Sequence, residues 1–287
     1  MDTVRVIPRL DIKGPNLVKG IHLEGLRVLG RPEHFAKYYY SQGADELIFM
    51  DVVASLYERN SLHDIISNTA KEIFIPLTVG GGLRTIEDIR NVLRAGADKV
   101  SINTAAINNP EIITEAALKF GSSTIVVAIE AIKEYKSDKY LAYTDNGREY
   151  TGIDIFEWAQ KVEEMGAGEL VITSVDREGT GEGMDIGMID KISKLVDIPV
   201  IAHGGVGKKE DVKELFDKTD AKAVSLASLL HYDYIQNGYE IGDHPGEGNI
   251  EFLNKKKSFH TFKDCSLETL KQYLFENEIS VRVESNE

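Results

Sequence analysis

The chain has 287 residues, of which 42% are hydrophobic and 28% are charged, so it holds enough apolar sequence for a large core. Its formal net charge of −14 argues against a nucleic-acid-binding surface, and no apolar run approaches the roughly 18 residues of a membrane span. The single cysteine, Cys265, excludes an intramolecular disulfide and a cysteine-based metal site, and the N-terminus lacks the pattern of a signal peptide, so we expect a cytoplasmic protein that contacts neither nucleic acid nor membrane.

Short apolar segments alternate with helical patterns along the chain. The segments are nearly continuous and rich in β-branched residues, which is typical of buried parallel strands. The predicted strands are Arg5–Asp11, Glu46–Asp51, Pro76–Gly80, Lys99–Asn103, Thr124–Glu130, Glu169–Ser174, Pro199–His203 and Lys222–Ala227. The predicted helices are Pro32–Gln42, Leu62–Lys71, Thr85–Arg94, Pro110–Lys119, Ile153–Met165, Met188–Leu195, Glu210–Lys218 and Leu267–Glu276. Such alternation predicts a single (β/α)8 TIM barrel over residues 1–287, with an open doubly wound sheet as the alternative.

Three connections are long. Residues 12–31 follow the first predicted strand and are expected to act as a lid, and residues 131–152 contain the hairpin signal Asp145-Asn146-Gly147. Residues 232–265 follow the last strand and are predicted to form an insertion loop, with a short helix near Ile250–Lys255.

The second half of the chain repeats the first. In each half an Ile-Pro and a short strand precede a glycine turn, a helix with a polar start and a strand that ends in small residues. This repeat indicates two duplicated half-barrels. Glycine turns let backbone N–H groups approach and hold an anion, so we predict two phosphate sites, with plain structural turns as the alternative. The predicted phosphate contacts are Gly82, Asn103 and Thr104 in one half, and Gly179, Gly204, Gly205, Ala227 and Ser228 in the other.

Two carboxylates end equivalent strands of the repeat. Asp11 ends the first strand and Glu130 the fifth, so in a duplicated barrel they face each other across its mouth. That arrangement suits general acid–base catalysis, while capping or salt-bridged acids are the alternative. Further candidates for substrate contact are Lys19, Asp51, Thr173 and Asp176. The alternative is an ordinary exposed lysine for Lys19 and ordinary polar loop residues for the others. The histidines show no metal-ligand spacing, so we predict neither a metal nor a cofactor.

Charged residues start several strands at the opposite end of the predicted barrel. Arg5, Glu46, Lys99 and Glu169 alternate in sign and would form a ring there. Charges of this kind are usually surface salt bridges of little energetic weight. A ring of them at one level also suits a gate on a passage along the barrel axis.

Taken together, these residues resemble the HisF family, the cyclase subunits of imidazole glycerol phosphate synthase. The resemblance covers most of the chain. Its motifs are Ile7-Pro8-Arg9-Leu10-Asp11, Asp45-Glu46-Leu47, Thr78-Val79-Gly80-Gly81-Gly82, Gly96-Ala97-Asp98-Lys99-Val100-Ser101-Ile102-Asn103-Thr104, Gly166-Ala167-Gly168-Glu169 and Thr173-Ser174-Val175-Asp176-Arg177-Glu178-Gly179-Thr180.

The resemblance implies a TIM barrel that receives ammonia from a glutaminase (HisH-like) partner at its lower face. Ammonia passes along the axis and reacts with a phosphoribulosyl formimino carboxamide ribonucleotide, which carries a phosphate at each end. The family's acid–base pair falls on Asp11 and Glu130, and its interface aspartate on Asp98. Its ammonia-gate charges fall on Arg5, Glu46, Lys99 and Glu169.

The chain departs from the family pattern at its catalytic end. It has Glu130 and Glu178 where the family has Asp, Arg9 where it has Cys, and His203 where it has Ser. With the insertion loop, these departures favour a divergent branch that passes ammonia onward to a sugar amidotransferase, in the synthesis of acetamidino sugars for surface polysaccharide or flagellin. The alternative is a genuine imidazole glycerol phosphate synthase cyclase of histidine biosynthesis. A third class is a phosphate-binding barrel without catalysis.

Overall fold

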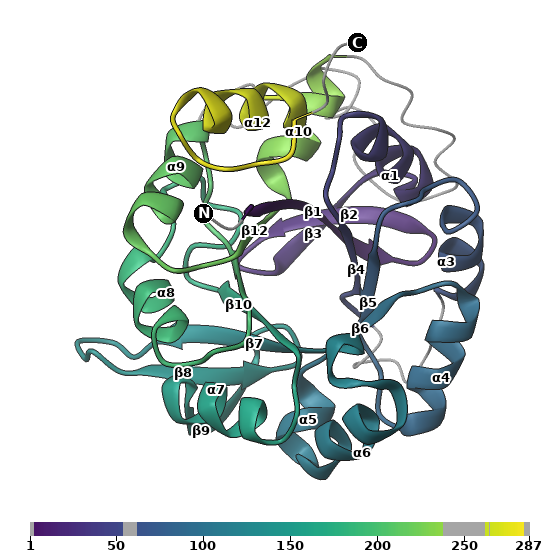
Figure 1. Cartoon of the computed structure of the whole chain (residues 1–287), viewed down its shortest axis with the longest axis vertical. Coiled ribbons are helices and arrows are strands. Elements are labelled where there is room, and N and C mark those ends of the chain that lie inside the picture. Colours follow the sequence, from purple (N-terminus) through teal and green to yellow (C-terminus); the bar gives the residue numbers. More distant parts are fainter. Residues whose placement is uncertain (1–2, 54–61, 238–261, 264, 284–287) are drawn as a thin grey trace.

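Eight parallel strands close into a barrel with helices packed around it (Figure 1). The computed structural model describes residues 3–53, 62–237, 262–263 and 265–283. The barrel strands are β1 (Arg5–Lys13), β4 (Leu47–Asp51), β5 (Leu77–Gly80), β6 (Lys99–Ile102), β7 (Ile125–Lys133), β10 (Glu169–Ser174), β11 (Val200–His203) and β12 (Ala223–Leu226). Each pairs with the next, and β12 pairs with β1 while β7 pairs with β10, which closes the ring. The predicted TIM barrel is confirmed.

Helices connect successive strands on the outside of the barrel (Figure 1). They are α1 (Pro32–Ser41), α3 (His63–Thr69), α4 (Ile86–Ala95), α6 (Glu111–Phe120), α7 (Ile155–Glu164), α8 (Ile186–Ser193), α9 (Lys209–Lys218) and α12 (Leu267–Glu276). Local sequence explains where they start. Thr85 begins α4 with a capping box, in which its hydroxyl accepts from the Asp88 N–H at 3.1 Å and the Asp88 carboxylate accepts from the Thr85 N–H at 2.9 Å. Ser266 caps α12 through the Thr269 N–H at 3.1 Å.

Two short helices were not predicted, and one of them corrects the expected insertion. α5 (Thr104–Asn108) and α10 (Ser228–Gln236) start at the small residues that end β6 and β12. The predicted loop at Tyr232 therefore begins inside α10, which continues to Gln236 because its apolar side chains are buried on every side. A 3-10 turn, η1 (Ser122–Thr124), precedes β7. Most of the predicted insertion, including the helix near Ile250–Lys255, lies outside the described residues.

Antiparallel hairpins extend the first strand of each half of the barrel. β2 (Asn16–Ile21) and β3 (Glu24–Gly30) extend β1, while β8 (Tyr140–Thr144) and β9 (Glu149–Asp154) extend β7. The second hairpin was predicted, and its turn residues Asp145 and Asn146 have positive φ angles of 53° and 60°. The equivalent placement of the two hairpins is the structural form of the sequence repeat.

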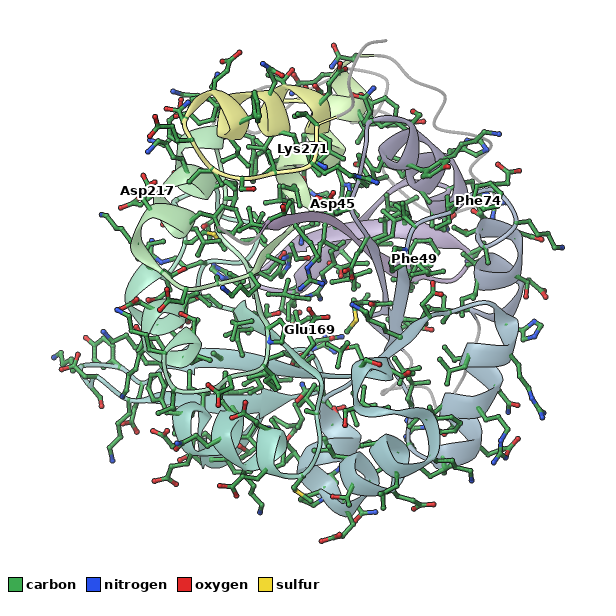
Figure 2. The ribbon with its side chains drawn as sticks, viewed as in Figure 1. Asp45, Phe49, Phe74, Glu169, Asp217 and Lys271 are labelled. Carbon is green, nitrogen blue, oxygen red and sulfur yellow. The ribbon has the colours of Figure 1, made fainter. Side chains whose placement is uncertain are left out.

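The barrel interior is layered because side chains alternate across each strand. Along β1, Arg5, Ile7, Arg9 and Asp11 point inward in turn. A central apolar layer consists of Ile7, Ile48, Val126, Ala128, Val171, Ile201 and Ala223. A charged layer with Arg5 and Glu169 lies on the side where β1 begins, and Glu169 is near the middle of the ring of strands in Figure 2. A polar layer with Arg9 and Asp11 lies on the other side. A second and larger apolar core fills the space between strands and helices.

Candidate active site at the carboxyl ends of the strands

The two predicted acid–base residues have opposite protonation preferences. Asp11 lies in β1 and Glu130 in β7, both at the carboxyl-end face and both buried, with 2% and 8% exposed surface. Burial raises the pKa of Asp11, but the charges of Arg9 and Lys19 outweigh it and lower this pKa to about 2. Burial raises the pKa of Glu130 to about 7. The Gly147 N–H, which donates to this carboxylate at 2.8 Å, lowers the pKa but does not outweigh burial. Asp11 is therefore a carboxylate at neutral pH, while Glu130 is poised to hold a proton.

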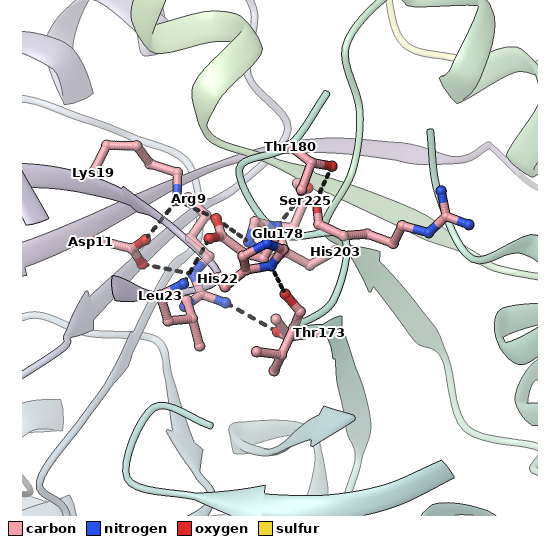
Figure 3. Close-up of polar contacts among 12 residues, drawn as sticks. Arg9, Asp11, Lys19, His22, Leu23, Thr173, Glu178, Thr180, His203 and Ser225 are labelled. Atoms are coloured by element: carbon pink, nitrogen blue, oxygen red, sulfur yellow. Dashed lines mark hydrogen bonds and ion pairs between the residues drawn. The ribbon is translucent and has the colours of Figure 1, made fainter. Parts of the chain in front are cut away.

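A buried ion cluster surrounds Asp11 (Figure 3). The Arg9 Nε donates to Asp11 Oδ1 at 2.8 Å, and the Lys19 Nζ lies 3.6 Å from Asp11 Oδ2. Lys19 also donates to Glu178, whose Oε1 lies 3.9 Å from the His203 Nε2. Burial, assisted by the Arg9 charge, lowers the pKa of His203 to about 3, so this imidazole is neutral and its Nδ1 donates to the Ser225 carbonyl oxygen at 2.9 Å. The cluster thus pairs two cations with two carboxylates.

The β2–β3 hairpin is closed over this cluster. The His22 N–H donates to the Glu178 carbonyl oxygen at 2.9 Å, and the Leu23 N–H donates to the Glu178 carboxylate at 3.2 Å. The His22 ring nitrogen Nδ1 lies 2.9 Å from the Val175 carbonyl oxygen. Lys19 is 2% exposed, so its interpretation as an ordinary surface lysine is wrong. Glu178 therefore holds the hairpin, which was expected to act as a lid, against the loop that follows β10.

The first predicted phosphate site is an open cavity beside Glu130. Its volume is about 240 Å³, and it brings together Asp51, Gly82, Asn103, Thr104 and Glu130. Gly81 has a φ of 97°, and a Cβ there would lie 2.2 Å from the Asp51 carbonyl oxygen, so the turn requires glycine.

The second predicted site is nearly filled. Its residues do come together, namely Gly179, Gly204, Gly205, Ala227 and Ser228, but the cavity has a volume of only about 20 Å³. That is space for about one water molecule, so a phosphate group does not fit. Glu178, His203 and Phe262 complete its wall. In this conformation a phosphate group could enter only if residues of the wall moved.

Two predicted contacts lie elsewhere, and two contributors were missed. Asp176 is exposed and accepts from the Lys133 N–H at 2.8 Å, so it borders a separate groove beside the β7–β8 hairpin. Thr173 lies inside the barrel and accepts from Arg9 rather than lining either cavity. Asn146 lines the first cavity from the β8–β9 turn. Its Asn-Gly signal predicted the turn, but not that the turn would fold over Glu130, and the sequence did not reveal that Arg9 binds Asp11.

The four charges predicted at the opposite face form a closed ring. The Arg5 Nη1 lies 2.5 Å from Glu46 Oε1, and Arg5 also pairs with Glu169. The Lys99 Nζ lies 3.0 Å from both Glu46 Oε2 and Glu169 Oε2. Asp98, on the same face, is exposed, and its carboxylate accepts from the Leu77 N–H at 2.8 Å. The ring stands on the barrel axis below the apolar layer, and its role as a gate stays a prediction.

Neither a metal centre nor a spanning helix is found in the described part of the chain. Among these residues no group of three or more His, Cys, Asp or Glu side chains is placed to hold a metal ion. No helix within the same ranges is long and apolar enough to cross a membrane.

Comparison with known proteins places the chain in a family. The model of the family "histidine biosynthesis protein" matches residues 5–236. The imidazole glycerol phosphate synthase subunit HisF of Legionella pneumophila is 56% identical over 211 residues, which are 74% of this chain and 99% of that protein. The HisF subunit of Lactococcus lactis subsp. cremoris (strain SK11) is 50% identical over 232 residues, 81% of this chain and 90% of the relative. That of Hydrogenobaculum sp. (strain Y04AAS1) is 45% identical over 279 residues, 97% and 98% of the two chains.

These relatives correct the function that we preferred from the sequence. Each is named as a subunit of imidazole glycerol phosphate synthase, and nothing in the matches supports a sugar-amidating branch. The four departures at the catalytic end do not outweigh identity of this extent, so the alternative interpretation is the better supported one. The chain therefore belongs to the histidine biosynthesis protein family, in the group of HisF cyclase subunits.

Proposed function

We propose that the chain is the ammonia-dependent cyclase subunit of an imidazole glycerol phosphate synthase. It takes ammonia and a phosphoribulosyl formimino carboxamide ribonucleotide, and it cleaves and cyclises this substrate to imidazole glycerol phosphate and aminoimidazole carboxamide ribonucleotide. The observation that carries the proposal is the pair of buried carboxylates at the barrel mouth whose pKa values are shifted in opposite directions, down to about 2 for Asp11 and up to about 7 for Glu130.

The two carboxylates divide the proton transfers. Ammonia must lose protons when its nitrogen enters the new ring, and the departing amine must gain one. Asp11, held ionised by Arg9 and Lys19, accepts a proton, and Glu130, whose protonated form is favoured by burial, donates one. Removal of either side chain should therefore lower kcat strongly and weaken substrate binding only slightly.

The substrate spans the barrel mouth with one phosphate in each half. Gly82, Asn103 and Thr104 hold the first phosphate in the open cavity, close to Glu130 and Asp51. Gly179, Gly204, Gly205, Ala227 and Ser228 hold the second once the nearly filled site opens. Lys19 couples the second phosphate to the lid. A phosphate that attracts the Lys19 ammonium group competes with Glu178 for it, and so weakens the ion pair that joins the β2–β3 hairpin to the loop after β10. Thr173 and Asp176 contact the middle of the substrate only if Arg9 and Lys133 release them.

Ammonia enters from a glutaminase (HisH-like) subunit at the face that carries Asp98. Support comes from the relatives, which are themselves named as subunits of a synthase, and from the order of layers along the axis. The ring of Arg5, Glu46, Lys99 and Glu169 stands at the entrance, and the apolar layer above it suits passage of neutral ammonia rather than the ammonium ion. The ring must open for each molecule that passes.

The experiment that tests this function is steady-state turnover of the ribonucleotide by the purified chain with an ammonium salt and no partner. We expect turnover in the wild type and its loss in Asp11→Asn, which keeps the size of the side chain but removes the charge. Arg90→Met serves as the control variant, because Arg90 lies on the outer helix α4, pairs with Glu87 and lines neither cavity. A wild type that binds the ribonucleotide, seen by calorimetry, and does not turn it over would refute the proposal.

A further inference from the structure

A buried arginine, Arg9, lies inside the barrel above the central apolar layer. Arg9 alternates with Ile7 and Asp11 along β1, so its side chain points to the axis, and it is 4% exposed. Its Nε donates to Asp11 at 2.8 Å, and its Nη1 donates to the Thr173 hydroxyl at 3.2 Å (Figure 3). β12 and β11 stand between β1 and β10 in the ring of strands. The guanidinium therefore reaches across the interior, from one strand of the first half to one of the second.

A cation at this position loses hydration free energy, because the layer directly below consists of aliphatic side chains such as Ile7, Ile48 and Val171. An apolar side chain of similar volume would continue that layer at least as stably. The structure compensates the buried charge with Asp11 in contact and with the charge of Glu178 near by. Arg9 lines neither phosphate cavity. A role through Asp11 explains why the charge is there.

We propose that Arg9 is a positioning residue, whose guanidinium clamps the Asp11 carboxylate in one orientation and keeps it an ionised proton acceptor. Nε fixes one Asp11 oxygen, and the hydrogen bond to Thr173 prevents the guanidinium from rotating away. The second Asp11 oxygen faces Lys19. This inference rests on the proposed function, in which Asp11 accepts a proton.

No other group around Asp11 can replace Arg9. Lys19 is 3.6 Å from Asp11 and is shared with Glu178 of the loop after β10. His203 of β11 lies close to this carboxylate, and His231 of α10, whose Nδ1 lies 2.7 Å from the Tyr39 hydroxyl, also feels its charge, but burial lowers the pKa of each histidine to about 3, so both are neutral. The remaining titratable groups near by, Glu178 and Glu130, are acids and supply no positive charge. Without Arg9, burial favours the protonated form of Asp11 and leaves one shared cation to oppose it.

Two substitutions separate the charge of Arg9 from its geometry. Arg9→Met removes the charge and keeps much of the length, while Arg9→Lys keeps the charge and loses the fork that reaches Asp11 and Thr173 together. For Arg9→Met we expect kcat with ammonium salt to fall about 100-fold, which is the effect of a misplaced catalytic group, with little change in KM for the ribonucleotide. We also expect the acidic limb of its pH–rate profile to move to higher pH. Arg9→Lys should lower kcat but keep the wild-type acidic limb.

A second readout does not depend on turnover. Carbon-13 NMR of aspartate-labelled protein, with the Asp11 resonance assigned by its absence in Asp11→Asn, follows the protonation of Asp11 directly. We expect Asp11 to titrate at higher pH in Arg9→Met than in the wild type, and Arg90→Met, which removes a half-buried arginine of the outer helix α4, to leave it unchanged.

The outcomes are distinguishable. If the wild type shows no turnover, the proposed function fails, and the NMR titration alone decides on Arg9. Wild-type kcat and an unmoved Asp11 titration in Arg9→Met overturn the clamp. If Arg9→Met does not fold, Arg9→Lys decides, because wild-type kcat in that variant shows that the fork is not needed.

Discussion

Replacing Glu130 by Gln separates its catalytic role from its effect on stability. The amide has the shape of the carboxyl group and still accepts from the Gly147 N–H, which lies 2.8 Å from the carboxylate in the wild type. It can neither ionise nor donate a proton to a leaving amine. A general acid contributes about 10²–10⁴-fold to rate, so we expect ammonium-dependent kcat to fall by that factor.

The same substitution should stabilise the protein. Glu130 has a folded-state pKa of about 7, above its usual value of 4.5, because it is buried. Unfolding then releases a proton between these two pH values, so the wild type loses stability as pH rises from about 4.5 to about 7, whereas the variant does not. The difference approaches roughly 3 kcal/mol above neutral pH. Below pH 4.5 both side chains are neutral in both states, and the two proteins should unfold alike.

The assays are urea unfolding at several pH values and steady-state turnover over the same range. Wild-type kcat should also fall as pH rises through about 7, because Glu130 then loses the proton that it donates. Three results would refute the reasoning: wild-type turnover in Glu130→Gln, a variant no more stable than the wild type at about pH 8, or a stability difference that does not depend on pH.

Three further substitutions test the first cavity, the ring and the outer core. Gly81→Ala places a Cβ 2.2 Å from the Asp51 carbonyl oxygen at a φ of 97°, which should lower stability by about 1–3 kcal/mol. It should also raise KM for the ribonucleotide, and an unchanged KM would argue against a phosphate there. Lys99→Met removes one of the two cations of the ring. Turnover with glutamine and the glutaminase partner should then fall relative to turnover with an ammonium salt. A constant ratio of the two would contradict the gate. Lys271→Met removes the ammonium group that lies 2.8 Å from the half-buried Asp45. Arg282 still faces this carboxylate at 3.3 Å, so the loss should be about 1–3 kcal/mol in urea unfolding, without a change in kcat. A loss within about 0.5 kcal/mol would show that Asp45 does not need Lys271.

The strands and the positions of the site were accessible from the sequence. Short β-branched runs that alternate with helical patterns predict buried parallel strands, and in a barrel such strands bring their carboxyl ends to one face. Asp11 and Glu130 could be placed at that face from their positions at strand ends alone, and Arg5 and Lys99 at the opposite face because they start strands. The glycine turns were equally accessible, because paired glycines mark a backbone conformation that other residues rarely adopt. Gly81 has that conformation in the structure.

Protonation and contacts across the barrel were decided by the tertiary structure. Lys19 and Glu178 are 159 positions apart in the chain, as Arg9 and Thr173 are 164 apart, and no local pattern records that they meet. The sequence shows two similar carboxyl groups, but burial and neighbouring cations lower the pKa of Asp11 and raise that of Glu130. Local periodicity depends on side chains a few residues apart, so the sequence by itself determined the strands and the face on which each functional group lies. A pKa, a closed lid or a filled cavity depends on atoms brought together from distant segments, so only the folded barrel decided which groups are charged and which cavity is open.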